Sequence, residues 1–371
     1  MTKRAHGEGS YYQRPNGSWQ YLIVVNGRRV SGSGKTQAEA KRNAKQAAQL
    51  AAPKATKGTL TDLVDEWAKV EPSKHGLRPT TRDQYVYLMR SQVIPVLGDL
   101  QLSKLTAAKV AEFFQSLDVS ASTARSTYAG LVKVLDFAVD MQRVGTNVAR
   151  LVKRPTAAKS KSREITQQEA QRLLEAAQGH RWEVCAWLAF GCGLRRGEIL
   201  ALRWVDVDLD KGELHVVGNL TRSSAGLIVG QPKTDKGTRR VPIPESVVTV
   251  LKKRRKDQAA ERLAAGELWR DTGAVISTEI GGFVEPRNMS RVWAQWARKA
   301  KLPESGTHIG RHYAATALLA SGKASVADVA AQLGHDPAVL LNTYAVAVAD
   351  GQRRAADVLG ASLVAVPQGE K

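Results

Sequence analysis

The sequence predicts a multidomain α+β protein: a small three-stranded β-sheet with one helix, then an all-helical part, then a mainly helical part with a small antiparallel sheet. Three observations lead to this prediction. The 371 residues exceed the usual size of a single compact domain. The apolar periodicity changes along the chain from that of strands to that of helices and then to a mixture. Two basic stretches, 53–58 and 153–161, have the composition of linkers and separate the three parts.

The first part, residues 1–55, is expected to be a three-stranded sheet with one helix. Asn-Gly pairs favour tight hairpins because both residues tolerate positive φ. Two such pairs interrupt aromatic and β-branched runs, at positions 16–17 and 26–27. Thr36 and Glu39 then have the spacing of a capping box, which predicts that a polar helix over 37–51 begins there.

The second part, residues 59–153, is expected to be helical throughout. Its first apolar residues recur at helical spacing: Leu60, Leu63, Val64 and Trp67. Thr80 and Asp83 are predicted to cap the next helix. Further helices are expected over 106–117 and 121–140.

The third part, residues 162–355, combines helices with a small sheet, and a tail follows over 356–371. A capping box at Thr166 and Glu169 begins the first helix. Two helices are expected near 167–178 and 182–192, and alternating residues predict antiparallel strands within 205–217 and 227–243. Helices then return up to residue 349. One of them carries a capping box at its start, Ser325 with Asp328, and Gly334 as the cap at its end.

The chain is strongly basic. Its 55 lysines and arginines outnumber 35 acidic residues, which gives a formal net charge of +20 and an isoelectric point near 10.0. The first 58 residues alone contain eleven basic residues and two glutamates. Such an excess favours a polyanionic partner, most simply nucleic acid. Charge alone leaves a generally basic protein with no such partner as an alternative.

The cysteine count and the apolar runs bear on the compartment. Cys185 and Cys192 lie in an apolar helical stretch and are expected to be buried free thiols, because no disulfide framework or zinc spacing is present. The first residues lack the apolar segment of a secretion signal, and no run reaches the roughly 18 apolar residues of a membrane span. We therefore expect a soluble, cytoplasmic protein without a membrane partner.

Several residues of the third part could carry chemistry. Arg195 lies in a Gly-Leu-Arg-Arg-Gly-Glu turn between two helical stretches, and His308 and Arg311 would share a helix face at i and i+3. The others lie at the tip of an expected hairpin, at a helix end and in an apolar stretch: Lys233, His335 and Tyr344. Taken singly, each is more simply explained as a solvated or packed residue.

The order of these motifs is more specific than any one of them. Gly-Leu-Arg-x-Gly-Glu, Lys-Thr in a hairpin, His-x-x-Arg-His, Leu-Gly-His, and a tyrosine nine residues later together resemble the signature of the tyrosine recombinases. The resemblance covers the whole third part. The second part resembles the core-binding domain of that family, and the first resembles the arm-binding domain of phage integrases.

The resemblance implies a reaction and a role for each residue. Arg195 and Arg311 would clamp the scissile phosphate, because guanidinium groups stay charged and bind two oxygens at once. His308 and His335 would hydrogen-bond the phosphate or move the proton of the nucleophile. Lys233 would be the general acid for the 5′-hydroxyl. Tyr344 would attack phosphorus to form a 3′-phosphotyrosine, with no need for a metal, a cofactor or ATP.

Three positions leave the assignment open or depart from the family pattern. Arg196 lies beside Arg195, so only the motif register chooses between them. Lys236 lies three residues from Lys233 and could exchange roles with it. Gly310 stands where the family usually has leucine, which is expected to loosen that helix turn without affecting the catalytic pair.

The resemblance also implies partners. It predicts double-stranded DNA with core-type and arm-type attachment sites, a homotetramer that exchanges strands through a Holliday junction, and a bacterial cytoplasm with the protein at the nucleoid. A host DNA-bending protein and an excision factor are further possible partners. The alternatives are a chromosome-dimer resolvase, a type IB topoisomerase, or a non-catalytic DNA-binding regulator derived from an integrase.

Two sequence patterns look like ligand-binding sites but are more simply explained by local structure. Gly32-Ser-Gly34-Lys35-Thr36 resembles a phosphate-binding loop, but Arg29 occupies the position of its first glycine. Three aspartates that alternate with apolar residues could line a metal site, but a half-exposed strand gives the same pattern. They are Asp206, Asp208 and Asp210.

Overall fold

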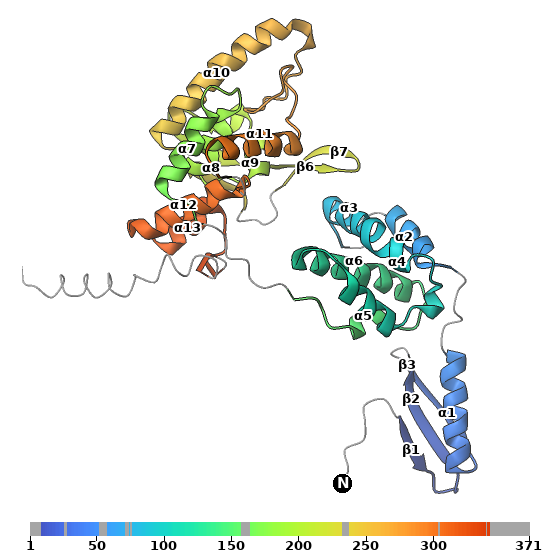
Figure 1. Ribbon diagram of the computed structural model, residues 1–371. Helices are drawn as coiled ribbons and strands as arrows, with labels where there is room; N and C mark the ends of the chain where they lie inside the picture. Colours follow the sequence, from blue (N-terminus) through green and yellow to red (C-terminus); the bar gives the residue numbers. More distant parts are fainter. Residues whose placement is uncertain are drawn as a thin grey trace, which may run out of the picture. The chain divides into compact units, whose positions relative to one another are not determined.

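The chain forms two compact units, Met1–Ser160 and Lys161–Lys371. The computed structural model describes the following residues: 9–25, 28–51, 58–70, 74, 76–156, 164–231, 237–302, 305–338 and 340–341. Within the first unit, these residues form two separate hydrophobic cores, one in a sheet-and-helix part and one in a helical part (Figure 1). The second unit contains the candidate site.

The N-terminal part is the expected antiparallel sheet with one helix. Its strands follow the chain order, and the helix lies against the sheet (Figure 1). Ala40 and Ala44 of the helix form a buried cluster with Tyr21 of the sheet. The elements are β1 (Ser10–Gln13), β2 (Trp19–Val25), β3 (Arg28–Gly34) and α1 (Gln37–Ala51). The first Asn-Gly pair makes the predicted turn, with Gly17 at φ 79°. The second pair lies outside the described residues.

Packing explains the glycines of the apparent phosphate-binding loop. A Cβ on Gly32 would lie 2.5 Å from the hydroxyl oxygen of Tyr21, and one on Gly34 would lie 2.5 Å from the amide nitrogen of Ala40. Thr36 and Glu39 form the expected helix start: the Glu39 amide donates to Thr36 Oγ1 at 3.2 Å, and the Lys35 amide donates to Glu39 Oε2 at 2.8 Å. The glycines therefore serve the close contact of the sheet with its helix.

The helical part has one core, to which the first helix contributes the four predicted residues. Leu60, Leu63, Val64 and Trp67 are all completely buried, as their spacing predicts. The α-helices are α2 (Leu60–Lys69), α3 (Pro79–Leu88), α4 (Ile94–Leu97), α5 (Ala107–Ser116) and α6 (Ala121–Asp140). Shorter helical turns are a π-turn, η2 (Met89–Val93), and two 3₁₀ turns, η3 (Leu102–Lys104) and η4 (Val148–Leu151).

The predicted cap of the second helix is wrong. Helix α3 begins at Pro79, and its N-cap residue Arg78 makes no side-chain capping bond. Proline is favoured at the first helical position because its φ is already fixed and it has no N–H to satisfy. Asp83, expected to cap with Thr80, instead forms an ion pair with Arg82 (Nε–Oδ1, 3.1 Å).

The C-terminal unit is mainly helical, as predicted. Its α-helices are α7 (Gln167–Ala177), α8 (Glu183–Gly191), α9 (Arg196–Ala201), α10 (Glu245–Ala265), α11 (Pro286–Lys299), α12 (His308–Ser321) and α13 (Val326–Leu333). Two 3₁₀ turns are η5 (Trp204–Asp206) and η7 (Gly266–Leu268). The predicted capping boxes of α7 and α13 are both present. The helices expected after residue 341 lie outside the described residues.

The strands of this unit form two sheets rather than one. Their bounds are β4 (Val207–Asp208), β5 (Glu213–Val216), β6 (Asn219–Ser223), β7 (Gly226–Gly230) and β8 (Arg239–Pro242). One sheet has the order β4-β5-β8, and β6 pairs with β7 in a separate ribbon (Figure 1). The strands on either side of residues 232–236 therefore pair with β6 and β5, and not with each other, which corrects the expected hairpin. Strand β6 escaped prediction because its residues, NLTRS, are mostly polar.

Helix α8 lies at the centre of the unit. Seven of its nine residues are buried, which is typical of a helix packed on all sides. Helix α12 packs on it at Gly310, where an added Cβ would lie 2.9 Å from Ala189 Cβ and 3.0 Å from the Ala189 carbonyl carbon. Gly310 thus permits a close helix contact, and the expectation that it loosens its helix turn stays a prediction.

Both cysteines of the chain are buried in this unit and unpaired, as predicted. Burial raises the pKa of the Cys192 thiol to about 12 and also raises that of Cys185. Both thiols therefore stay protonated at neutral pH. Among the residues described, no helix combines the length and the apolar character that a membrane span requires.

Replacing Gly310 by leucine should destabilise the C-terminal unit. The side chain would overlap the α8 backbone at Ala189. Overpacking of this kind outweighs the gain in helix propensity, so we expect a net loss of about 2 kcal/mol in urea unfolding. The matched control is Gly306→Leu, because a Cβ at Gly306 meets no atom within 4 Å. Equal stabilities of the two variants would contradict the close-contact role of Gly310.

Candidate active site

Arg195 is held in place by the turn between α8 and α9. Gly193 adopts φ +66° directly beneath Leu333, and an added Cβ would lie 2.3 Å from Leu333 Cδ2. Arg195 is the N-cap residue of α9, and its amide donates to Glu198 Oε2 at 3.0 Å. Its guanidinium Nη1 donates to Glu198 Oε1 at 2.7 Å. The orientation of Arg195 is therefore set by one carboxylate.

Glu198 is a buried carboxylate, with only 4% of its surface exposed. A second arginine, Arg239 at the start of β8, also donates to it, from Nη2 to Oε2 at 3.1 Å and from Nη1 to Oε1 at 3.4 Å. Burial by itself would raise the pKa of Glu198. The charge and hydrogen bonds of Arg239, followed by those of Arg195, outweigh burial and hold this pKa below its usual value. Glu198 is thus ionised and accepts hydrogen bonds from both arginines.

Arg311 lies in the first turn of α12 and is buried, with 4% of its surface exposed. Its Nη1 donates to the Gly193 carbonyl at 2.8 Å, and its Nη2 donates to the Leu333 carbonyl. This side chain therefore connects three segments that are far apart in the sequence: the α8–α9 turn, α12 and the end of α13.

His335 follows the last residues of α13. Gly334 ends this helix in the left-handed conformation (φ 61°, ψ 48°), as predicted, and the His335 amide donates to the Ala330 carbonyl at 2.9 Å. The His335 Nδ1 atom is buried and finds no hydrogen-bond partner among the described residues. Burial lowers the pKa of His335 to about 4, and the charges of Arg311 and Arg195 add to this effect. The imidazole is therefore neutral at physiological pH.

His308 is the first residue of α12 and lies at the surface. Its pKa is lowered by partial desolvation, and then by the neighbouring charges of His312, Arg196, Arg311 and Arg195. These electrostatic contacts place His308 beside both arginines of the predicted clamp. Arg196 itself turns toward α11, where its Nη1 donates to Ser290 Oγ. Since Arg195 binds Glu198 and Arg196 does not, the geometry supports the motif register that selects Arg195.

Three arginines hold the last carbonyl groups around the end of α13. Arg239 Nε donates to the Gln332 carbonyl at 2.8 Å. Arg311 donates to the next carbonyl, at Leu333, and Arg195 Nη2 lies 3.5 Å from that of Gly334. Carbonyls at a helix end carry partial negative charge, so cations suit this place. The helix end thus spaces the three guanidinium groups.

The structure brings together four of the six predicted site residues. Arg195, His308, Arg311 and His335 come from separate segments and converge beside the end of α13. Lys233 and Tyr344 lie outside the described residues. Sequence reasoning missed Arg239. The available signal was alternation, because Arg239 and Val241 are both buried on one face of β8, where an arginine is unusual.

This arrangement favours an anionic ligand. Three guanidinium groups, those of Arg195, Arg239 and Arg311, stand against one carboxylate, Glu198, so positive charge exceeds negative charge at the site. Guanidinium groups can stabilise the negative charge that develops on phosphate oxygens in a displacement at phosphorus. Neutral imidazole can accept or donate a proton. The described residues therefore include groups that can bind a phosphate and transfer a proton.

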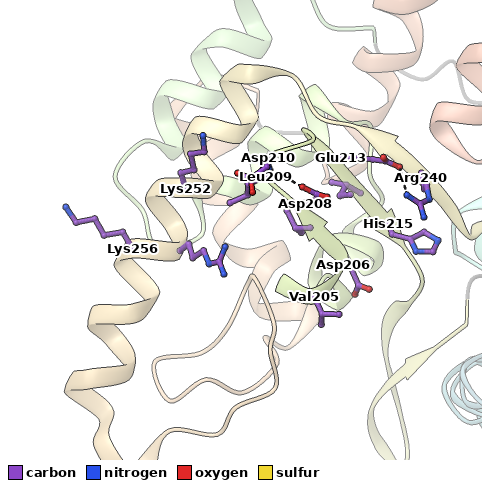
Figure 2. Close-up of a pocket in the computed structure, with 13 residues that line it drawn as sticks. Val205, Asp206, Asp208, Leu209, Asp210, Glu213, His215, Arg240, Lys252 and Lys256 are labelled. Atoms are coloured by element: carbon purple, nitrogen blue, oxygen red, sulfur yellow. Dashed lines mark hydrogen bonds and ion pairs between the residues drawn. The ribbon is translucent and has the colours of Figure 1, made fainter.

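A separate depression of about 760 Å³ lies between the β4–β5 strands and α10 (Figure 2). Its rim includes the three alternating aspartates considered as metal ligands: Asp206, Asp208 and Asp210. The Asp208 carboxylate accepts the turn amides of Asp210 and Lys211, at 3.2 and 2.9 Å. Within the described part of the chain, no three His, Cys, Asp or Glu side chains are grouped as metal ligands would be. The expected half-exposed strand is thus limited to Val207–Asp208, and the Asp208 carboxylate caps the turn that follows it.

Comparison with known proteins identifies relatives of both units. The sequence model described as the phage integrase family matches residues 163–349, half of the chain. The model of the phage integrase N-terminal SAM-like domain matches residues 59–117. A tyrosine recombinase XerC-like protein of Caldanaerobacter subterraneus subsp. tengcongensis is 28% identical over 303 residues, which cover 75% of this chain and 76% of the relative.

Solved structures show the same fold. The Tn1549 transposon integrase in complex with transposon right end DNA has a TM-score of 0.63 at 18% identity, and the match covers 82% of this chain and all of that one. A lambda integrase tetramer bound to a Holliday junction has a TM-score of 0.54 at 18% identity, covering 90% of this chain and 94% of that one.

The depressed pKa of His335 predicts that stability falls with acidification. The folded pKa, about 4, lies below the ordinary value of 6.5, so between these values the unfolded chain binds more protons than the folded chain. Stability that is present above pH 6.5 is therefore lost as the pH falls toward 4. In urea unfolding, the loss between pH 7 and pH 5 should be smaller in His335→Asn than in the wild type, by on the order of 1 kcal/mol. An equal loss in both proteins would show that His335 is not held neutral by the fold.

Proposed function

This chain belongs to the phage integrase family of tyrosine-type site-specific recombinases, and we propose that it integrates a phage or other mobile element into host DNA and can excise it by the same chemistry. The convergence of Arg195 and Arg311 with two imidazoles beside the end of α13 carries this proposal. Guanidinium and imidazole groups can bind the oxygens of a scissile phosphate. The strongly basic composition of the chain also favours DNA as the partner.

The two arginines bind the non-bridging oxygens of the scissile phosphate. Each is already oriented by a carbonyl near the end of α13, so little rearrangement is needed when DNA binds. Negative charge grows on these oxygens in the transition state, and the guanidinium groups stabilise it. The same cations lower the energy of the ionised nucleophile.

Tyr344 is the nucleophile in this proposal. Its phenolic oxygen forms a bond to phosphorus while the bond from phosphorus to the 5′-oxygen breaks, which leaves a 3′-phosphotyrosine. His335, neutral at physiological pH, can accept the phenol proton, and Lys233 gives a proton to the departing 5′-oxygen. Attack by a 5′-hydroxyl on the phosphotyrosine reverses the step with another strand, so the covalent bond conserves the energy for rejoining.

Each part of the chain has a place in this proposal. Residues 1–55 bind arm-type DNA sites, residues 59–153 bind core-type sites, residues 162–355 carry the reaction, and residues 356–371 form a tail. The charge of the first part and the SAM-like match of the second support these roles. Two linked DNA-binding parts raise each other's effective concentration at the DNA. Most of the affinity comes from phosphate contacts and declines steeply with salt.

The proposed assembly is a homotetramer on DNA in the cytoplasm of a bacterial host, at the nucleoid. The similarity of fold to an integrase that was solved as a tetramer on a Holliday junction supports it. A host DNA-bending protein and an excision factor would bind the same DNA sites. Strand exchange in pairs requires four active sites on two duplexes, which is the reason for four protomers.

Trapping of a covalent adduct tests the nucleophile. With a nicked suicide substrate that carries the core site, the wild-type protein should form a protein–DNA adduct on a denaturing gel, and Tyr344→Phe should form none. Tyr313→Phe is the matched control, because Tyr313 packs edge-on against Phe190 in the same unit and should leave the adduct unchanged. An adduct in Tyr344→Phe would mean that another residue attacks. No wild-type adduct on a site that the protein binds would favour a non-catalytic DNA-binding role.

Arg195→Lys tests the clamp. Lysine keeps the charge but cannot match the forked contacts to Glu198 and the Gly334 carbonyl. The single-turnover rate of adduct formation should fall by about 10²–10³-fold, the usual loss for one transition-state donor. The dissociation constant for core-site DNA should change by less than about threefold, because many other phosphate contacts remain. A loss confined to binding would contradict the role of Arg195 in the transition state.

A further inference from the structure

Arg239 is a buried, multiply bonded arginine that the proposed mechanism does not use. It is the first residue of β8, and only 9% of its surface is exposed. Its guanidinium donates to both oxygens of Glu198, to the Gln332 carbonyl at 2.8 Å and to the Gly237 carbonyl at 3.1 Å. One side chain therefore joins β8, the first turn of α9 and the end of α13.

These contacts lead directly to the residues of the candidate site. Glu198 is the carboxylate that orients both the amide and the guanidinium of Arg195. Gln332 stands two residues before Gly334, whose carbonyl lies 3.5 Å from the guanidinium of Arg195. Arg239 thus acts on Arg195 from two directions, through the shared carboxylate and through the end of the helix.

We propose that Arg239 is a positioning residue for recombination: it fixes Glu198 and the end of α13 and thereby sets the orientation of Arg195 toward the scissile phosphate. It does not touch the DNA itself. This inference rests on the proposed function, and it adds a residue to the working site that the family motifs described above do not contain.

A purely structural role would be served as well by apolar packing. Burying an ion pair costs desolvation energy on both sides, and well-packed apolar residues often replace such pairs without loss of stability. The next inward-facing residue of β8, Val241, is completely buried and apolar. The charge at position 239 is explained instead by Glu198, which must remain ionised to accept two bonds from Arg195.

Arg254 offers a matched comparison within the same unit. It lies on α10, is 4% exposed, and forms a bidentate pair with Glu261 at 2.8 and 3.0 Å. It also donates to the Val275 carbonyl and to Ser277 Oγ, both at 3.2 Å. The burial and bonding of Arg254 therefore resemble those of Arg239, but none of its partners belongs to the candidate site.

The first experiment compares Arg239→Gln and Arg254→Gln in the full chain with the wild type. Adduct formation is measured in a single turnover on a suicide substrate at saturating protein, and the rate is corrected for the folded fraction. Arg239→Gln should be about 10–100-fold slower, since a small misplacement of a catalytic group has effects of this size. Arg254→Gln should react at the wild-type rate. Core-site affinity, measured by fluorescence anisotropy, should stay within about threefold for both variants.

The dependence of the rate on pH separates positioning from general damage. In Arg239→Gln, burial still raises the pKa of Glu198 but the largest opposing charge is gone, so this pKa should rise. Arg195 and His335 remain the charged and titratable groups beside it. The rate of Arg239→Gln should therefore fall more steeply than that of the wild type as the pH decreases from 8 to 6. Arg239→Lys restores the charge and should remove this extra fall while remaining slower, because lysine lacks the fork.

Each outcome decides the proposal. A wild-type rate in Arg239→Gln, an equal loss in Arg254→Gln, or a pH profile unchanged from the wild type would overturn it. Should Arg239→Gln fail to fold, as judged by circular dichroism, Arg239→Lys carries the test, and a wild-type rate in that variant would overturn the proposal. Absence of an adduct with the wild type would overturn the proposed function as well, so the two failures are distinguishable.

Discussion

The candidate site depends on the end of one helix. The carbonyls of Gln332, Leu333 and Gly334 each face a guanidinium group from a different part of the C-terminal unit. These carbonyls cannot all be satisfied within α13, because a helix leaves its last acceptors without intrahelical donors. Arginines supply the missing donors, and the fixed spacing of the carbonyls in turn fixes the spacing of the arginines. The carbonyls that need donors at the end of α13 thus determine where the three guanidinium groups of the site lie.

Three glycines allow the surrounding elements to reach this helix end. Gly193 passes beneath Leu333 with positive φ, and Gly310 lets α12 approach α8 so that Arg311 can reach the Gly193 carbonyl. Gly334 turns the chain out of α13 in a left-handed conformation that side chains adopt at a cost of about 1 kcal/mol. Each of these glycines allows a contact that the site needs. This explains why all three lie within the sequence motifs of the site.

Most of the features that could be predicted from the sequence depend on only a few consecutive residues. Capping boxes at Thr166 and Ser325 and the glycine at position 334 are features of a few consecutive residues, and the structure confirms all three. The division of the strands into two sheets could not be predicted, because pairing joins residues that are distant in the sequence and β6 has few apolar residues. The start of α3 was misassigned because Pro79 competes with Thr80, and both are good starting residues. The convergence of Arg195, His308, Arg311 and His335 followed from motif order, whereas the contacts of Arg239 are visible only in three dimensions.

The charges of the site explain why it remains open to a ligand. Arg195 and Arg239 share one ionised carboxylate, Glu198, while Arg311 binds backbone carbonyls, so the free site has excess positive charge in a partly buried place. Burial, followed by the charges of the neighbouring arginines, lowers the pKa of His335, so this histidine adds no further positive charge to the free site. In the proposed mechanism, a phosphate diester brings one negative charge to the same place, which favours the protonated form of the imidazole and so a higher pKa. His335 would then be a better base for the proton of the proposed nucleophile. Burial and positive charge, which together keep His335 neutral in the free protein, thus also make its basicity depend on a bound anion.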